Sequence, residues 1–212
     1  MKWLSLLQKL GDQALFDLPS AVQLSGEPQP HVTAQLSRWI GSGKLIPLRR
    51  GLYAIGDVYR RTVLSPVQVA NELYRPSYLS CLSALSFYGL VPDAVPIYQS
   101  VTTRVTRRFT NSTGTFAYSS LKQSLFWGSV TRAIDGVDFS IAEPEKALLD
   151  LWHLSSGEWS RERMLGMRFQ QVDLVDPSRL DCYAERWQSP RIRRATARWV
   201  RLVEDEAFED LT

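Results

Sequence analysis

Residues 43–54 read Gly43-Lys44-Leu45-Ile46-Pro47-Leu48-Arg49-Arg50-Gly51-Leu52-Tyr53-Ala54. Apolar residues on both sides of Arg49-Arg50-Gly51 predict two short strands joined by a basic turn that a glycine closes. The segment before this hairpin, Pro30 to Gly41, predicts an amphipathic helix, because its apolar residues recur at helical spacing. These apolar residues are Val32, Leu36, Trp39 and Ile40. A helix followed at once by a basic hairpin is typical of a winged helix-turn-helix, whose helix enters the major groove of DNA while its hairpin lies along the phosphates.

The opposite side of the predicted helix carries small and hydrogen-bonding side chains, which let a helix approach base edges closely. We expect this side and the basic residues of the hairpin to converge on one surface that contacts DNA. The predicted contacts are His31, Thr33, Ala34, Ser37, Arg38, Lys44, Arg49 and Arg50. Two simpler alternatives are an ordinary amphipathic helix with a solvated side and a charged turn that keeps a strand edge soluble.

The residues before this helix complete a small domain. Apolar residues at spacings of three and four predict a first helix over residues 3–10, and Leu18-Pro19-Ser20 begins a second helix. Three helices and a hairpin within about 55 residues match the size of one winged-helix module. We therefore predict an α+β protein with an N-terminal winged helix-turn-helix domain, residues 1–60, and a larger mixed α+β C-terminal domain, residues 61–212.

The C-terminal domain is expected to combine helices with a sheet. Helices are predicted at residues 67–74, 77–88 and 144–152, strands at 97–103, 114–118 and 137–141, and a turn at 110–113. After residue 152 the chain is expected to be mostly helical.

The last predicted helix begins at Pro190 and is basic and amphipathic. Its arginines form one stripe and its apolar residues form the neighbouring stripe. The arginines are Arg191, Arg194, Arg198 and Arg201, and the apolar residues are Ile192, Ala195, Trp199 and Leu202. Such a helix usually docks its apolar side on its own domain, which we favour over a role in binding a partner.

The net charge of +3 is unevenly distributed along the chain. Residues 1–110 contain 12 Lys and Arg against 6 Asp and Glu, whereas residues 111–212 contain 13 against 16. A basic first half suits contact with phosphates. Three of its arginines, Arg104, Arg107 and Arg108, can extend the DNA contact, bind another anionic partner or lie on a solvated hairpin.

The chain lacks the residues that several kinds of functional site require. Two cysteines are too few for a disulfide framework, and with only two histidines in addition the chain lacks the ligands of a zinc site. No stretch approaches membrane-spanning length, and Gln8 and Lys9 interrupt the apolar start too early for a signal peptide. We expect a cytoplasmic protein with no metal ion, no cofactor and no membrane partner.

One candidate for catalysis is a nucleotidyltransferase arrangement. Gly128-Ser129, followed by Asp135 and Asp138, resembles a Gly-Ser loop with paired metal-binding acids. The interval is too short, and the two acids do not lie on one face of a strand. We reject this interpretation.

A second candidate is a phosphate site at Glu145, Lys146 and Asp150. A negative residue also suits the start of a helix, which Pro144 opens, and Lys146 is then expected on the surface of that helix. The sequence has no phosphate-binding Gly-rich loop and no turn that presents a serine nucleophile. We predict no catalytic residues.

Three segments, in this order along the chain, carry a resemblance to a known family. They are Gly43–Leu45 with Arg49–Tyr53, then Pro76–Ser80 with Ser83–Leu85 and Tyr88–Leu90, and finally Ile141–Asp150. In this combination the chain resembles the AbiEi family, the antitoxins of type IV toxin–antitoxin systems. The resemblance covers most of residues 20–155. The two prolines in Glu27-Pro28-Gln29-Pro30, at the entry to the predicted third helix, depart from the family's usual pattern.

The resemblance implies a phage-defence protein with two activities. The winged helix would repress the protein's own operon by binding inverted repeats of double-stranded DNA, with a dimer on the operator. The C-terminal domain would neutralise a nucleotidyltransferase-like toxin encoded beside it, without requiring a stable complex. Two alternatives stay open at this point: a winged-helix regulator with a ligand-sensing C-terminal domain, and an antitoxin that enzymatically modifies its toxin.

Overall fold

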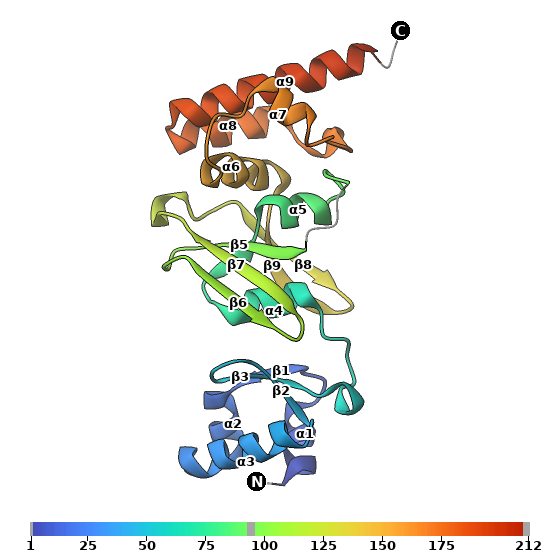
Figure 1. The fold of residues 1–212 in the computed structure, drawn as a ribbon, viewed down its shortest axis with the longest axis vertical. Coiled ribbons are helices and arrows are strands. Elements are labelled where there is room, and N and C mark those ends of the chain that lie inside the picture. The colour runs from blue at the N-terminus through green and yellow to red at the C-terminus, as the bar shows by residue number, and fades with distance from the viewer. Residues whose placement is uncertain (1, 93–95, 210–212) are drawn as a thin grey trace.

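The computed structural model describes residues 2–92 and 96–209, with side chains up to residue 205 (Figure 1). The protein is of the mixed α+β class, as predicted. An N-terminal unit, residues 2–59, which ends with η1 (Asp57–Tyr59), and a larger C-terminal unit follow one another along the longest axis of the molecule (Figure 1).

The N-terminal unit packs three helices against a small antiparallel sheet. Its elements are α1 (Trp3–Leu10), β1 (Leu15–Asp17), α2 (Leu18–Ser25), α3 (Gln29–Gly41), β2 (Leu45–Arg49) and β3 (Leu52–Ile55). The strands lie in the order β1–β3–β2. The core of the unit consists of Leu6, Leu10, Phe16, Ala21, Val32, Leu36, Leu45 and Ile55. The predicted helices and hairpin are confirmed, and the three-residue strand β1 is too short for its sequence pattern to have revealed it.

The turn from α3 into the hairpin depends on two glycines. Gly43 has a φ of +70° and donates to the Ile40 carbonyl at 3.0 Å, while the Lys44 amide donates to the Trp39 carbonyl at 2.9 Å. This pair of bonds is a Schellman arrangement, which satisfies the last carbonyls of the helix. Gly56, after β3, packs so closely here that a Cβ atom on it would lie 2.3 Å from the Gly43 carbonyl oxygen. The hairpin is therefore held tightly against the end of α3.

The C-terminal unit is built around a six-stranded sheet. Its first elements are α4 (Pro66–Leu73), β4 (Ser77–Leu79), α5 (Cys81–Phe87), β5 (Ile97–Thr102), β6 (Arg107–Asn111), β7 (Gly114–Ser120), η2 (Gln123–Leu125), β8 (Ser129–Ile134) and β9 (Val137–Ala142). The helical remainder comprises α6 (Pro144–Leu154), α7 (Arg161–Leu165), η3 (Val172–Leu174), α8 (Pro177–Trp187) and α9 (Pro190–Glu209). The strand order is β6–β7–β5–β4–β9–β8. The β5–β7 and β4–β9 pairs are parallel, and the other pairs are antiparallel.

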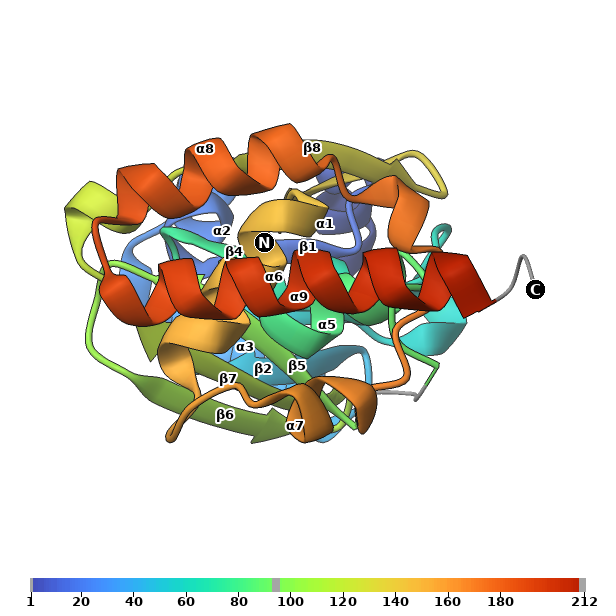
Figure 2. The same ribbon diagram turned by 90° about the horizontal axis from the view of Figure 1, so that it is seen from above.

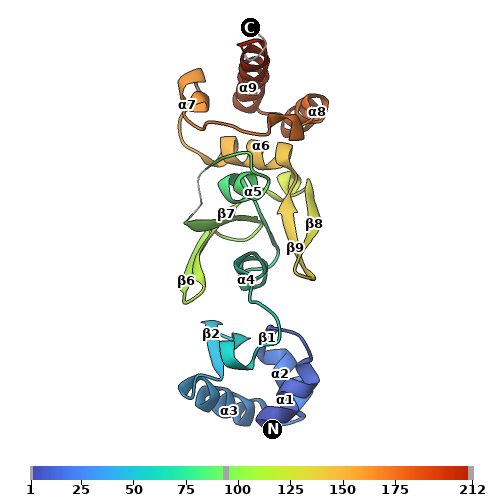
Figure 3. The same ribbon diagram turned by 90° about the vertical axis from the view of Figure 1, so that its right-hand side faces the viewer.

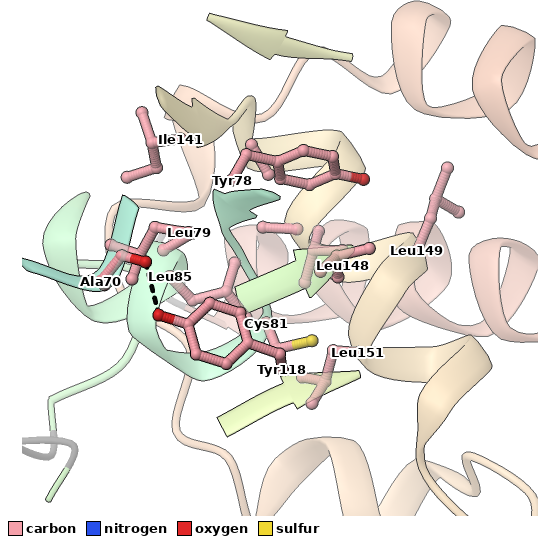
Figure 4. Close-up of a cluster of buried hydrophobic side chains, with 14 of the residues drawn as sticks. Ala70, Tyr78, Leu79, Cys81, Leu85, Tyr118, Ile141, Leu148, Leu149 and Leu151 are labelled. Atoms are coloured by element: carbon pink, nitrogen blue, oxygen red, sulfur yellow. Dashed lines mark hydrogen bonds between the residues drawn. The ribbon is translucent and has the colours of Figure 1, made fainter. Parts of the chain in front are cut away.

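Helices cover both sides of this sheet. Helix α4 lies on the side that faces the N-terminal unit, and α5 and α6 lie on the opposite side (Figures 1 and 3). Beyond α6, helices α8 and α9 lie side by side and form an outer layer (Figure 2). Between the sheet and its helices is the main core, where Leu79, Ile141 and Leu148 are fully buried (Figure 4).

The structure corrects three predictions for the C-terminal unit. The predicted helix 77–88 is wrong at its start, because residues 77–79 form β4, which joins the two halves of the sheet by pairing with β5 and β9. Strands β6 and β8 were not predicted, and Thr110 and Asn111 belong to β6 rather than to a turn. Both are edge strands rich in exposed polar residues. Their strand conformation comes from pairing with a neighbour and not from local pattern.

The two units contact each other directly. The Leu48 carbonyl accepts a hydrogen bond of 3.1 Å from the Asn111 side chain, and five apolar residues of the N-terminal unit belong to the main core cluster. These five residues are Ala14, Leu15, Leu48, Leu52 and Ala54. The division of the chain into domains at residues 60 and 61 stays a prediction.

Candidate functional site

Helix α3 presents the predicted contact side to solvent. His31, Thr33, Ala34, Ser37 and Arg38 are all exposed, whereas Val32 and Leu36 are buried in the N-terminal core. The Ser37 hydroxyl donates to the Thr33 carbonyl at 3.0 Å, which leaves its lone pairs free to accept. The exposed side of α3 is therefore a row of small and polar side chains that ends in one arginine.

The sheet of the N-terminal unit lies between α3 and the C-terminal unit (Figures 1 and 3). Lys44, directly before β2, places its ammonium group 5.7 Å from the centre of the Trp3 ring. Arg49 lies at the other end of β2, roughly 16 Å away for five residues of strand rise. The basic residues of the hairpin are thus spread along it.

The tip of the hairpin faces the C-terminal unit. The Arg49 Nε donates a hydrogen bond of 2.7 Å to the Leu73 carbonyl at the end of α4, and its Nη1 donates to the Arg50 carbonyl at 2.9 Å. The first bond ties the tip to the neighbouring unit. The expected convergence of Arg49 and Arg50 with Arg38 and Lys44 on one surface is therefore not found, because the tip packs on α4 instead of projecting beside α3.

A cleft of about 1200 Å³ opens where the hairpin tip meets the C-terminal unit; we refer to it as the interunit cleft. Arg49 and Arg50 line the wall that the hairpin forms, and three arginines line the wall that the C-terminal unit forms. These three are Arg75, Arg104 and Arg107, and Tyr74 and Phe109 line the cleft with them. The sequence alone did not indicate that these two groups of arginines share one cavity.

The arginines of the C-terminal wall are held against aromatic rings. The Arg104 guanidinium lies 4.5 Å from the centre of the Tyr74 ring, and that of Arg107 lies 5.2 Å from the centre of the Phe109 ring. Stacking of this kind orients a guanidinium without neutralising its charge. Arg108 follows Arg107 in β6, so its side chain points to the opposite face of the strand.

A buried polar cluster lies at the centre of the C-terminal unit. The Lys146 ammonium donates to the Asp150 carboxylate and, at 2.8 Å, to the Tyr78 hydroxyl. The other carboxylate oxygen of Asp150 accepts from the Ser80 hydroxyl at 2.7 Å and from Tyr78 at 3.1 Å. Lys146 and Asp150 are both fully buried. The expectation that Lys146 lies on the surface of its helix is therefore wrong.

Three aromatic rings enclose the Lys146 ammonium. The ring centres of Trp187, Trp127 and Tyr78 lie 4.6, 5.2 and 5.4 Å from it. Gly128, with a φ of +70°, passes so close that a Cβ atom on it would lie 3.0 Å from the Lys146 Cγ. A buried cation is costly unless it is paired, and here one carboxylate, one hydroxyl and three ring faces compensate it.

Burial affects the pKa of both charged groups in this cluster. Loss of water lowers the pKa of Lys146 and raises that of Asp150, and each charge partly opposes the shift of the other. Because both residues have no exposed surface, we assign the cluster a structural role: it joins α6 to β4 and to α8. Lys146 and Asp150 stand four residues apart in α6, a spacing that suits an exposed ion pair equally well, so the sequence alone offered no signal of their burial.

Two arginines of the α9 stripe are engaged within their own unit. Arg194 and Arg198 donate to the two oxygens of Glu158 at 2.6 and 2.8 Å. Ile192, Ala195, Trp199 and Leu202 are buried. The prediction that this helix docks its apolar side on its own domain is confirmed.

Within residues 2–92 and 96–209, no helix has both the length and the apolar character needed to cross a membrane. In the same part of the chain, no group of three or more His, Cys, Asp or Glu side chains is arranged to hold a metal ion. No protein-family model matches the chain, and no curated protein matches it significantly.

Proposed function

We propose that this chain is a DNA-binding antitoxin of the type IV class, which represses its own operon and neutralises a nucleotidyltransferase-like toxin. The observation that carries the DNA-binding part is the exposed side of α3. It combines side chains small enough for close approach with an arginine that can pair with guanine or a phosphate.

We infer that the N-terminal unit acts as a winged helix-turn-helix, with α3 as its recognition helix. Support comes from the element order, in which α2 and α3 are followed directly by the β2–β3 hairpin. Lys44 precedes the hairpin on the α3 side, where it would reach a phosphate next to the groove that α3 enters. Since one such unit covers a single half-site, we expect two copies of the chain on an inverted repeat.

The antitoxin part of the proposal rests on the resemblance to the AbiEi family. One structural observation supports it: the second and third segments that carry the resemblance meet in the buried polar cluster. Tyr78 and Ser80 from one segment bond directly to Asp150 from the other. If the chain shares its domain fold with that family, the segments that carry the resemblance are expected to meet in this way, although they lie far apart in the sequence.

The DNA-binding proposal is tested by binding of the full chain to the inverted repeat upstream of its gene. Arg38→Ala is expected to weaken specific binding about tenfold or more, because one good contact to a base contributes about 1–3 kcal/mol. If the side chain contacts a phosphate instead, the slope of log affinity against log salt falls by about 0.9.

Arg193→Ala provides the matched control, because Arg193 is an exposed arginine on α9, far from α3. Operator affinity and salt slope that stay unchanged in a folded Arg38→Ala protein would contradict the assignment of α3. The antitoxin part is tested separately, by survival of cells that express the neighbouring toxin with and without this chain.

A further inference from the structure

The interunit cleft contains positive charge without a counterion. Among the described residues, no carboxylate lies within ion-pair distance of Arg50, Arg104 or Arg107. Arg104 and Arg107 also share one ring, since their guanidinium carbons lie 4.5 and 5.9 Å from the centre of Tyr74. Both positive charges thus lie beside the same ring, and an anion bound next to it would interact favourably with both.

Five acidic residues also line the interunit cleft, and three of them are already paired. Asp12 lies 3.7 Å from Arg61, Asp17 accepts from the Ser20 amide at the start of α2, and Glu72 pairs with Arg75. The remaining acids, Asp135 and Asp138, lie in and after the β8–β9 turn. The cleft therefore combines three unpaired arginines with two carboxylates on a separate element.

This arrangement suits a ligand that carries several phosphates together with hydrogen-bond donors. Guanidinium groups bind phosphate oxygens in pairs, and a preoriented guanidinium loses little freedom on binding. Carboxylates accept hydrogen bonds from hydroxyl or amino groups. The volume of about 1200 Å³ is sufficient for a ligand the size of a nucleotide.

We propose that the interunit cleft binds a small polyphosphate ligand of the nucleoside triphosphate type, with its phosphates held between Arg50 of the hairpin and Arg104 and Arg107 of the C-terminal unit. The negative phosphates of the ligand would attract arginines of both units and so link the two units electrostatically. This proposal goes beyond the proposed function, because the cleft and the exposed side of α3 are different surfaces.

The test measures binding of ATP and of inorganic tripolyphosphate to the full chain by isothermal titration calorimetry. We expect one site per chain, with binding that weakens as salt is raised. Arg107→Ala is expected to weaken it about tenfold or more, as for the loss of a charge-assisted hydrogen bond. Arg108→Ala is the matched control, since it removes the same charge from the next residue of β6 but from the opposite face.

Each outcome decides the proposal. Saturable binding that Arg107→Ala weakens and Arg108→Ala leaves unchanged supports it. Tighter binding of ATP than of tripolyphosphate would show that the cleft also contacts the nucleoside. No binding of either probe, or equal weakening by both variants, overturns it. If only operator DNA binding responds to Arg107→Ala, the arginines contact the DNA backbone and the small-ligand site is refuted. Thermal unfolding of both variants without ligand verifies that they are folded.

Discussion

At the scale of single residues, the C-terminal unit depends on a charged pair that has no exposed surface. Lys146 and Asp150 contribute little to stability through hydrophobic packing. Each is needed because it compensates the buried charge of the other. Tyr78 and Ser80 complete the coordination of the carboxylate. Removal of one partner should therefore harm the fold more than removal of both charges.

We predict that Asp150→Asn lowers the free energy of unfolding by about 3–5 kcal/mol, because it leaves a buried ammonium without a counterion. The double variant Lys146→Met with Asp150→Asn should recover part of this loss, since the amide oxygen still accepts from Ser80 and Tyr78. Urea unfolding of the three proteins measures both effects. A double variant no more stable than Asp150→Asn alone would show that the charge of Lys146 is not the cause.

At the scale of elements, α9 is attached by an apolar stripe and by arginines that contact a single loop. Hydrogen bonds from Arg198 and Arg194 lower the pKa of Glu158 below its ordinary value of 4.5. A carboxylate with a lowered pKa in the folded state stabilises the fold above its unfolded pKa, and this contribution is lost as the pH falls through the folded pKa. The attachment of α9 should therefore weaken below pH 4.5.

We predict that Arg194→Ala with Arg198→Ala lowers the unfolding temperature slightly at pH 7 and reduces the further drop between pH 5 and pH 3.5. The matched control is Arg193→Ala with Arg201→Ala, which removes two exposed arginines of the same helix. Calorimetry at several pH values measures the difference. An acid response identical in both double variants would rule out Glu158 as its source. Protection against the toxin should not change, because these arginines are engaged within their own unit.

At the scale of the whole molecule, the two units share a surface but have different cores. The buried residues of the N-terminal core lie within residues 6–55, whereas the main core contains the buried hydrophobic residues of the large sheet and its helices. The five N-terminal residues that join the main core lie at its edge near α4. Loss of the N-terminal unit should thus uncover one face without removing the sheet.

We predict that residues 61–212 fold as a fragment that is less stable than the full chain, protects cells against the neighbouring toxin and no longer represses the operon. Circular dichroism verifies folding, a survival assay measures protection and a reporter gene measures repression. A folded and abundant fragment without protection would contradict the separation of the two activities. Protection by residues 1–60 alone would contradict it more directly.

The sequence predicted the elements whose residues carry their own pattern. Helices α1, α3 and α9 bury residues at helical spacing, and the β2–β3 hairpin has its glycine at a φ of +78°. The exposed side of α3 followed from the same periodicity, because α3 packs on the N-terminal core through one stripe only. Strands β4, β6 and β8 have no such pattern, since their conformation depends on partners far away in the chain.

The chain by itself thus determined the fold class, the amphipathic helices and the residues that α3 exposes, because these depend on periodicities within one element. Only the tertiary structure decided where the hairpin tip packs, that Lys146 is buried and that Arg50 lines the same cleft as Arg104 and Arg107. Each of these facts joins residues from different elements. The physical reason is that the free energy of a charged side chain depends on the neighbours that packing brings to it, and local sequence does not specify those neighbours.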